Sequence, residues 1–213
     1  MSKPIFGSMK RALFAATTIA LGGALIAAGN AEPKATIGQP APDFTLIDYQ
    51  GNEHTLSSYT NQGNVVVLEW YSPACPFVKK HYREDTQTMN NLITEWEGKP
   101  VTWLRLNSAR TDHPYGDREA NIASFETFKI TGPVLVDSTG KVGKMYGAKR
   151  TPEMYVIDTE GTLVYHGAID NDRGASAPGA VNYVEKAVGE VLAGEPVSTP
   201  TTNAYGCGIK YQK

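Results

Sequence analysis

The sequence predicts an α/β fold in which a central mixed β-sheet is flanked by helices. The β-branched and apolar residues of Val65–Leu68 are typical of a strand that is buried on both faces. A proline-led helical stretch follows this strand, and further strand and helix patterns alternate as far as residue 192. Strands that alternate with helices are expected to form a sheet covered on both faces.

The N-terminus has the three parts of a secretory signal peptide. Lys3, Lys10 and Arg11 precede an uncharged apolar stretch at 12–28, and small residues end at Ala31. We expect cleavage after Ala31, which places the mature protein in the periplasm or outside the cell, with no integral membrane span. The alternative is an uncleaved membrane anchor, although the apolar stretch is shorter than the ~20 residues that a span needs.

The composition limits the partners of the mature chain. The protein has 213 residues, of which 20 are Lys or Arg and 22 are Asp or Glu. Residues 1–31 hold three of the basic residues and none of the acidic ones, which leaves 17 against 22. A mildly acidic chain without a basic block argues against nucleic acid and against an anionic membrane surface as partners. The length fits one domain, expected at 32–196, followed by an extended tail at 197–213.

The elements of this domain are predicted in order from their patterns. Residues 44–48 and 54–56 are strand-like around a Gly-containing turn, which predicts an N-terminal β-hairpin extension. After the buried strand we expect one helix from Cys75 to about Trp96, because its apolar residues recur at helical spacing. The later patterns predict a strand at 101–106, a helix at 120–129, a strand at 134–137, a small helix at 142–146 and a last helix at 181–192.

Cys75 is the first candidate for chemistry. Pro73 ends the preceding strand, and Pro76 suits the first turn of a helix because its missing N–H needs no partner there. We therefore expect Cys75 at a helix N-terminus, where unpaired amides and the helix dipole favour a thiolate. The alternative is an inert buried cysteine. In an oxidising compartment, Cys75 and Cys207 are expected to pair or to take part in thiol exchange.

Several segments in succession resemble the thioredoxin-like superfamily. Residues 75–78, Cys-Pro-Phe-Val, are similar to its active-site turn, with Val78 in place of a second cysteine. Arg150–Asp158 resembles the cis-proline turn and the strand after it, and residues 158–167 resemble its final hairpin. Pro40–Leu46 resembles the peroxiredoxin and alkyl-hydroperoxide-reductase (redoxin) branch. The resemblance covers roughly residues 36–195 and implies a thioredoxin-like fold, thiol chemistry and no cofactor.

The resemblance also implies which residues form the site. Cys75 would attack a substrate disulfide or an oxidant, and a cis Thr151–Pro152 bond would present the backbone to a substrate chain. Glu69, in the strand before the turn, is implied to relay protons to or from Cys75; the alternative is a carboxylate at a strand edge that reaches water. The residues implied to bind substrate are Trp70, Ser72, Pro76, Thr151 and Pro152.

The specialised peroxidase signature of the redoxin branch is half present. Its Pro-x-x-x-Thr/Ser-x-x-Cys pattern has Ser72 in the hydroxyl position, but Leu68 stands in the proline position. The arginine of that branch corresponds to Pro152, with Arg150 two residues earlier. We expect thiol–disulfide exchange with a protein disulfide or a low-molecular-weight thiol. The alternatives are a thiol peroxidase with a peroxide substrate, and a non-catalytic binding module with a structural disulfide.

Cys207 is the only other cysteine in the chain and the candidate partner of Cys75. With one cysteine in the turn, some second thiol must release a mixed disulfide or reduce a sulfenic acid. Gly206 and Gly208 flank Cys207, and we expect the tail to be free to bring it to the active face. A permanent disulfide that pins the tail and an external resolving thiol are the alternatives.

The histidines predict no metal site. His54, His113 and His166 have no metal-ligand spacing, so neither zinc nor copper is expected. His81 is expected to be a solvated helix residue rather than a catalytic base. Residues 170–173 are expected to form a hydrogen-bonded turn rather than a cation site.

Overall fold

The structure, a computed structural model, describes Met1 and residues 33–213, so the expected signal peptide lies outside the described residues apart from Met1. The described residues 33–213 belong to one compact unit. Within 33–213, no helix has both the length and the apolar character needed to cross a bilayer. The helices are α1 (Leu56–Thr60), α2 (Pro76–Tyr82), α3 (Thr88–Glu95), α4 (Arg118–Thr127), α5 (Lys141–Tyr146) and α6 (Tyr183–Leu192). The strands are β1 (Thr45–Asp48), β2 (Glu53–Thr55), β3 (Val65–Trp70), β4 (Val101–Asn107), β5 (Val134–Val136), β6 (Arg150–Thr151), β7 (Glu153–Ile157), β8 (Leu163–Gly167) and β9 (Cys207–Gly208).

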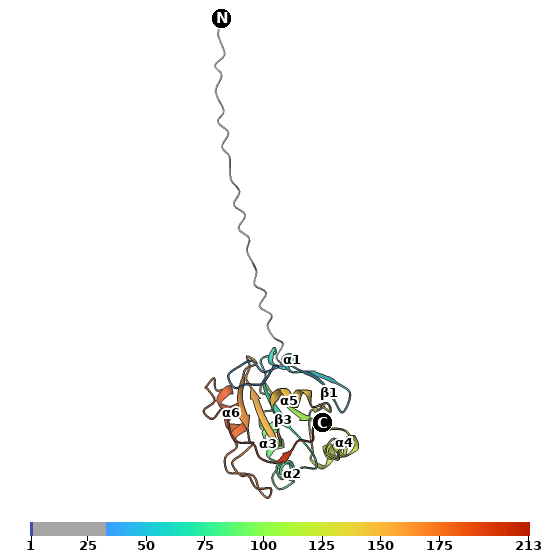
Figure 1. The fold of residues 1–213 in the computed structure, drawn as a ribbon. Helices are drawn as coiled ribbons and strands as arrows, with labels where there is room; N and C mark the ends of the chain where they lie inside the picture. The colour runs from blue at the N-terminus through green and yellow to red at the C-terminus, as the bar shows by residue number, and fades with distance from the viewer. Residues whose placement is uncertain (2–32) are drawn as a thin grey trace. The chain divides into compact units, whose positions relative to one another are not determined.

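Seven of these strands form a mixed sheet in the order β2-β1-β5-β4-β3-β7-β8 (Figure 1). The inner strands β5, β4 and β3 are parallel, and β7 runs antiparallel to β3. β1 and β2 are antiparallel, and β1 also pairs with β5, so this pair forms one edge of the main sheet. The predicted central mixed sheet is confirmed.

The two faces of β3 point into two separate cores. Val65 and Val67 pack into a core shared with α2, α3, α6 and the end of α4. Val66 and Leu68 face the other core, to which α1 and α5 contribute. Every residue of β3 is buried, which explains why its residues are apolar apart from Glu69 instead of alternating with polar ones. The helices on both faces, visible in Figure 1, complete the predicted α/β arrangement.

The single helix predicted from Cys75 to about Trp96 is wrong, because the chain forms two helices, α2 and α3. Arg83 leaves the helical conformation (φ −60°, ψ 153°), and Gln87 takes a left-handed one (φ 49°) before α3 begins. The Gln87 side-chain amide donates to the carbonyl of Tyr82 at 2.9 Å. A carbonyl at the end of α2 is thereby satisfied without another helical turn.

The tail at 197–213 is docked, so the prediction of a free tail is wrong. Residues 207–208 form β9, drawn in red in Figure 1, which pairs antiparallel with β6. Tyr205 is buried, and the carbonyl of Lys210 accepts a hydrogen bond from the Arg110 N–H at 2.8 Å. Backbone pairing and a buried aromatic ring therefore hold a segment whose Gly and Pro content suggested freedom.

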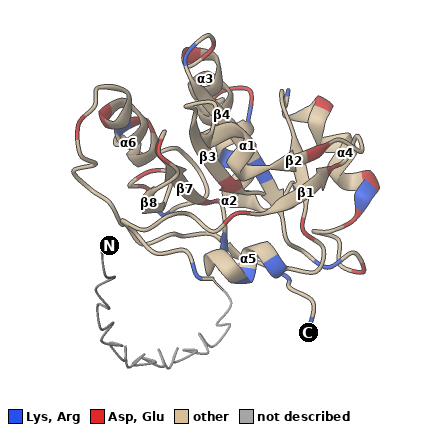
Figure 2. Cartoon of the chain, turned by 90° about the horizontal axis from the view of Figure 1, so that it is seen from above, with Lys and Arg blue, Asp and Glu red and all other residues tan. Residues whose placement is uncertain are grey.

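Acidic and basic residues are mixed over the surface. In Figure 2, positions of both signs occur together on single elements, α4 and α6 among them. This mixture agrees with the nearly balanced composition of the chain.

Candidate active site

Cys75 begins α2, as predicted. It is the N-cap residue in an extended conformation (φ −76°, ψ 122°), and its carbonyl accepts from the Lys79 N–H at 2.9 Å. Pro76 follows as the first helical residue, where its missing donor has no consequence. The Cys75 side chain has no exposed surface. A substrate therefore reaches it only when a covering segment moves.

The cis-proline turn lies directly against Cys75. The Thr151–Pro152 peptide bond is cis, as the resemblance implied. The Cys75 thiol donates to the carbonyl of Thr151 at 2.9 Å. Thr151 also stands opposite Cys207 in the β6–β9 pair. One residue thus contacts the cysteine of the helix and pairs with the cysteine of the tail.

Cys75 and Cys207 are both free thiols, and they interact with each other. Burial and the hydrogen bond with Cys75 raise the pKa of the Cys207 thiol to about 11, while the Tyr115 hydroxyl and Lys210 oppose this shift. Burial and Cys207 in turn raise the pKa of Tyr115. The sequence gave no sign of Tyr115, which belongs to a loop; only the folded chain brings it beside the thiols.

Four of the residues implied to bind substrate lie around Cys75. Thr151 and Pro152 form the turn against it, and both are buried. The carbonyl of Ser72 accepts from the Cys75 N–H at 3.1 Å, and Pro76 is exposed at the start of α2. The side-chain hydroxyls of Ser72 and Thr151 are buried and have no hydrogen-bond partner.

Trp70, the fifth of these residues, points away from Cys75. Its side chain is fully buried in the core on the opposite face of the sheet. Its indole N–H donates to the Ser108 hydroxyl at 3.0 Å, and that hydroxyl donates to Asp137 at 2.6 Å. This chain of hydrogen bonds anchors the end of β3, from which the active turn departs.

Glu69 is buried inside the sheet, so the alternative of a carboxylate that reaches water is wrong. The Tyr82 hydroxyl and the Trp103 indole donate to its Oε2 at 2.7 and 2.8 Å, and Arg105 Nε lies 3.6 Å away. Burial raises the pKa of Glu69, while Arg105 and the two hydrogen bonds oppose the shift. A proton relay between Glu69 and Cys75 stays a prediction.

His81 is fully buried, so the prediction of a solvated helix residue is wrong. Its Nε2 lies 3.1 Å from the Tyr205 hydroxyl of the tail, which covers this face of α2. Burial lowers the pKa of His81 to about 4, opposed by Asp170. Lys80 is buried as well, with Nζ 3.7 Å from the Asp170 carboxylate. Sequence reasoning missed this group because its members come from three distant segments.

The hydrogen-bonded turn predicted at residues 170–173 is present and extends to Gly174. Asp170 accepts from the N–H of Asp172 at 3.1 Å, and Asp172 accepts from the N–H of Gly174 at 2.6 Å. Over 33–213, no three His, Cys, Asp or Glu side chains are grouped so that they could hold a metal ion.

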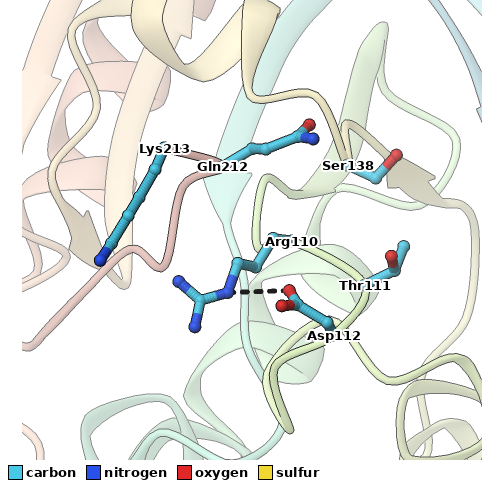
Figure 3. Close-up of a pocket in the computed structure, with 6 residues that line it drawn as sticks. All are labelled: Arg110, Thr111, Asp112, Ser138, Gln212 and Lys213. Carbon is cyan, nitrogen blue, oxygen red and sulfur yellow. Dashed lines mark ion pairs between the residues drawn. The ribbon is translucent and has the colours of Figure 1, made fainter.

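Two surface cavities lie near the segments that carry the site. One, of about 490 Å³, lies between the loop after β4 and the C-terminus, where Arg110 is paired with Asp112 at 2.8 Å (Figure 3). The other, of about 470 Å³, has Pro73, Ala74 and Lys79 on one side and residues of α4 on the other. The second cavity is lined by residues on both sides of Cys75 in the chain, while Cys75 itself is buried.

Fold and site together define a thioredoxin-like protein with one cysteine at the start of a helix and a second cysteine supplied by the C-terminal tail. The chain belongs to the AhpC/TSA family, which matches residues 37–166.

Individual proteins are similar to this chain at moderate identity. Thiol-disulfide oxidoreductase ResA of Geobacillus thermodenitrificans (strain NG80-2) is 30% identical over 128 residues, covering 60% of this chain and 66% of the relative, just under two thirds of its length. The structure of an uncharacterized conserved protein from Geobacillus kaustophilus has a TM-score of 0.74 and 27% identity, covering 86% of this chain and 94% of the other. The thioredoxin domain of a thiol-disulfide oxidoreductase from Bacteroides vulgatus shares the fold, with a TM-score of 0.50, 20% identity and coverage of 62% and 89%.

Proposed function

We propose that the protein is an exported thiol–disulfide oxidoreductase in which Cys75 attacks the substrate and Cys207 resolves the intermediate. The observation that carries this proposal is that Thr151 accepts a hydrogen bond from Cys75 and pairs with Cys207. The ResA relatives, which are named thiol-disulfide oxidoreductases, support the same reaction class.

In the proposed cycle, the Cys75 thiolate attacks one sulfur of a substrate disulfide, and the other substrate sulfur leaves as a thiolate. The Cys207 thiolate then attacks the Cys75 sulfur, so that an internal disulfide forms and the second substrate thiolate leaves. The two protons of the cysteines end on the two substrate thiols. The substrate is thereby reduced by two electrons and the protein is oxidised by two. The reverse sequence oxidises a dithiol.

The surroundings of Cys207 suit a resolving thiol. Its pKa of about 11 keeps it protonated at neutral pH, and part of that shift comes from Cys75. Once Cys75 is held in a mixed disulfide, its thiol no longer acts on Cys207, while the Tyr115 hydroxyl still favours the thiolate. Cys207 therefore becomes a better nucleophile at the step that requires it.

A thiol peroxidase is the second candidate, because the family match is to AhpC/TSA and Ser72 occupies the hydroxyl position. Within 33–213, however, no arginine side chain is hydrogen-bonded to Cys75. The buried Arg105 is held by Glu69 at 3.6 Å and by the Tyr82 hydroxyl at 2.7 Å. The peroxidase branch uses an arginine that this site does not present beside Cys75, whereas disulfide exchange needs no such arginine. Disulfide exchange is therefore the first candidate.

The proposed function is tested on reduced wild-type protein beside the Cys75→Ser and Cys207→Ser variants. We expect the wild type to catalyse insulin reduction and to yield one linked peptide of Cys75 and Cys207 after treatment with oxidised glutathione. Cys75→Ser should be inactive, and Cys207→Ser should accumulate a mixed disulfide at Cys75. An unreactive Cys75, or a linked pair that resists mild dithiol, contradicts the proposal in favour of a binding module. Peroxide consumption on the same samples identifies a peroxidase.

We further propose export. Residues 1–31 would be a signal peptide, with the domain at 32–196 and the tail at 197–213 acting in the periplasm or outside the cell. Mass spectrometry of protein from its native source should show a chain that begins at Glu32. A chain that retains residues 12–28 would instead indicate a membrane-tethered form.

A further inference from the structure

A cluster of buried polar side chains joins α2 to the C-terminal tail. Lys80 and His81 come from α2, Asp170 from the segment after β8, and Tyr205 from the tail. Each is at most 5% exposed. We call these four residues the latch. Because buried charged and polar groups are costly unless they are paired, such a cluster fixes the arrangement of the segments that contribute to it.

Tyr205 is the centre of the latch. Its hydroxyl donates a short hydrogen bond to Asp170 Oδ1 and lies 3.1 Å from His81 Nε2. The Lys80 ammonium group lies 4.6 Å from the centre of the Tyr205 ring and 3.7 Å from Asp170 Oδ1. The edge of the Phe77 ring also meets this ring, with centroids 6.0 Å apart. The tail is therefore held by charge, hydrogen bonding and packing at a single residue.

The hydrogen bonds fix the tautomer of His81. The one proton of the Tyr205 hydroxyl goes to Asp170, so His81 Nε2 must donate its own proton to the Tyr205 oxygen. Nδ1 then carries a lone pair, and this buried atom has no partner. Burial lowers the pKa of His81 to about 4, which agrees with a neutral ring in this position. The latch is thus organised around a Tyr205 hydroxyl that a phenylalanine could not replace.

We propose that the latch positions Cys207 for disulfide formation with Cys75, with Tyr205 and Asp170 as its positioning residues. Tyr205 precedes Cys207 by two residues, with only the bend at Gly206 between them, so docking of Tyr205 limits how far Cys207 can move. α2 begins next to Cys75 and carries His81 less than two turns later. The latch therefore ties together the helix that holds one cysteine and the tail that holds the other. This inference rests on the proposed redox pairing of the two cysteines.

The test is Tyr205→Phe, which removes the hydroxyl and keeps the packed ring. Tyr183→Phe is the matched control, because within 33–213 the Tyr183 hydroxyl makes no side-chain hydrogen bond. Each protein is equilibrated with mixtures of reduced and oxidised glutathione, and the fraction of linked Cys75 and Cys207 is measured by peptide mapping. We expect Tyr205→Phe to lower the equilibrium constant for the internal disulfide by on the order of tenfold, as for loss of a hydrogen bond to a charged group. Tyr183→Phe should leave it unchanged.

Hydrogen exchange of the reduced proteins gives a second measurement. The Ile209 N–H donates to the carbonyl of Lys149 at 3.1 Å, so its exchange reports on docking of the tail. We expect faster exchange at Ile209 in Tyr205→Phe, with unchanged exchange in the strands of the main sheet. An unchanged disulfide constant and unchanged exchange at Ile209 overturn the latch alone. A wild type that forms no internal disulfide overturns both the latch and the proposed function. If Tyr205→Phe unfolds globally, Asp170→Asn replaces it in the same two measurements.

Discussion

Gly206 is the residue at which one added methyl group should open the site. Its φ is +123°, a conformation that L side chains rarely adopt. A Cβ at this position would lie 2.1 Å from the Thr151 carbonyl oxygen and 2.9 Å from its carbon. That carbonyl also accepts the hydrogen bond from Cys75. Neither the tail nor the turn can give way without disturbing the other, so Gly206→Ala is expected to release the tail.

The magnitude follows from the backbone conformation. A non-glycine residue held in a sparsely populated region costs about 1–3 kcal/mol, before the contact with Thr151 is counted. A cost of about 2 kcal/mol multiplies the open population by about 30, since each 1.4 kcal/mol is a factor of ten. Cys75 has no exposed surface, so its alkylation requires the open state. Iodoacetamide should therefore modify Cys75 of the reduced Gly206→Ala variant about 30 times faster than that of the wild type.

The matched control is Gly189→Ala in α6. A Cβ at Gly189 meets no atom within 4 Å, and its backbone is helical. Alanine there should leave the alkylation rate of Cys75 unchanged and stabilise the helix slightly. If the alkylation rate of Cys75 in Gly206→Ala is within twofold of the wild-type rate, the tail does not control access to Cys75. The reasoning from the Thr151 contact is then refuted.

Two further predictions concern buried carboxylates. Glu69→Ala leaves the buried Arg105 guanidinium without its charged partner, so urea unfolding should show that the free energy of unfolding falls by about 3–5 kcal/mol; a fall below about 1 kcal/mol would mean that the pair is not buried as described. Burial disfavours the ionised form of Asp48, but hydrogen bonds from His54 and Asn52 outweigh it and lower its pKa from 3.8 to about 2. The ionised Asp48 thus stabilises the fold above pH 3.8, and this stability is lost as the pH falls through about 2. Asp48→Asn should therefore reduce the change in the free energy of unfolding between these two pH values. An unchanged pH dependence would contradict the lowered pKa of Asp48.

The sequence by itself determined the features that depend on neighbouring residues. The apolar run Val65–Leu68 in β3 predicted a buried strand, and Pro76 after Cys75 predicted a helix start. These two features follow from local backbone preferences and from side-chain periodicity, which a sequence displays directly. The cis Thr151–Pro152 turn was implied only by the resemblance to the thioredoxin-like superfamily.

Only the tertiary structure decided which polar residues are buried and where the tail lies. His81 was predicted to be a solvated helix residue, yet both His81 and its neighbour Lys80 are covered by segments that follow them by more than 80 residues in the chain. Cys207 reaches the active turn through pairing with Thr151, which no local pattern indicates. The physical reason is that burial of a charge depends on its partners, and the partners of this site are brought together only when the sheet has formed.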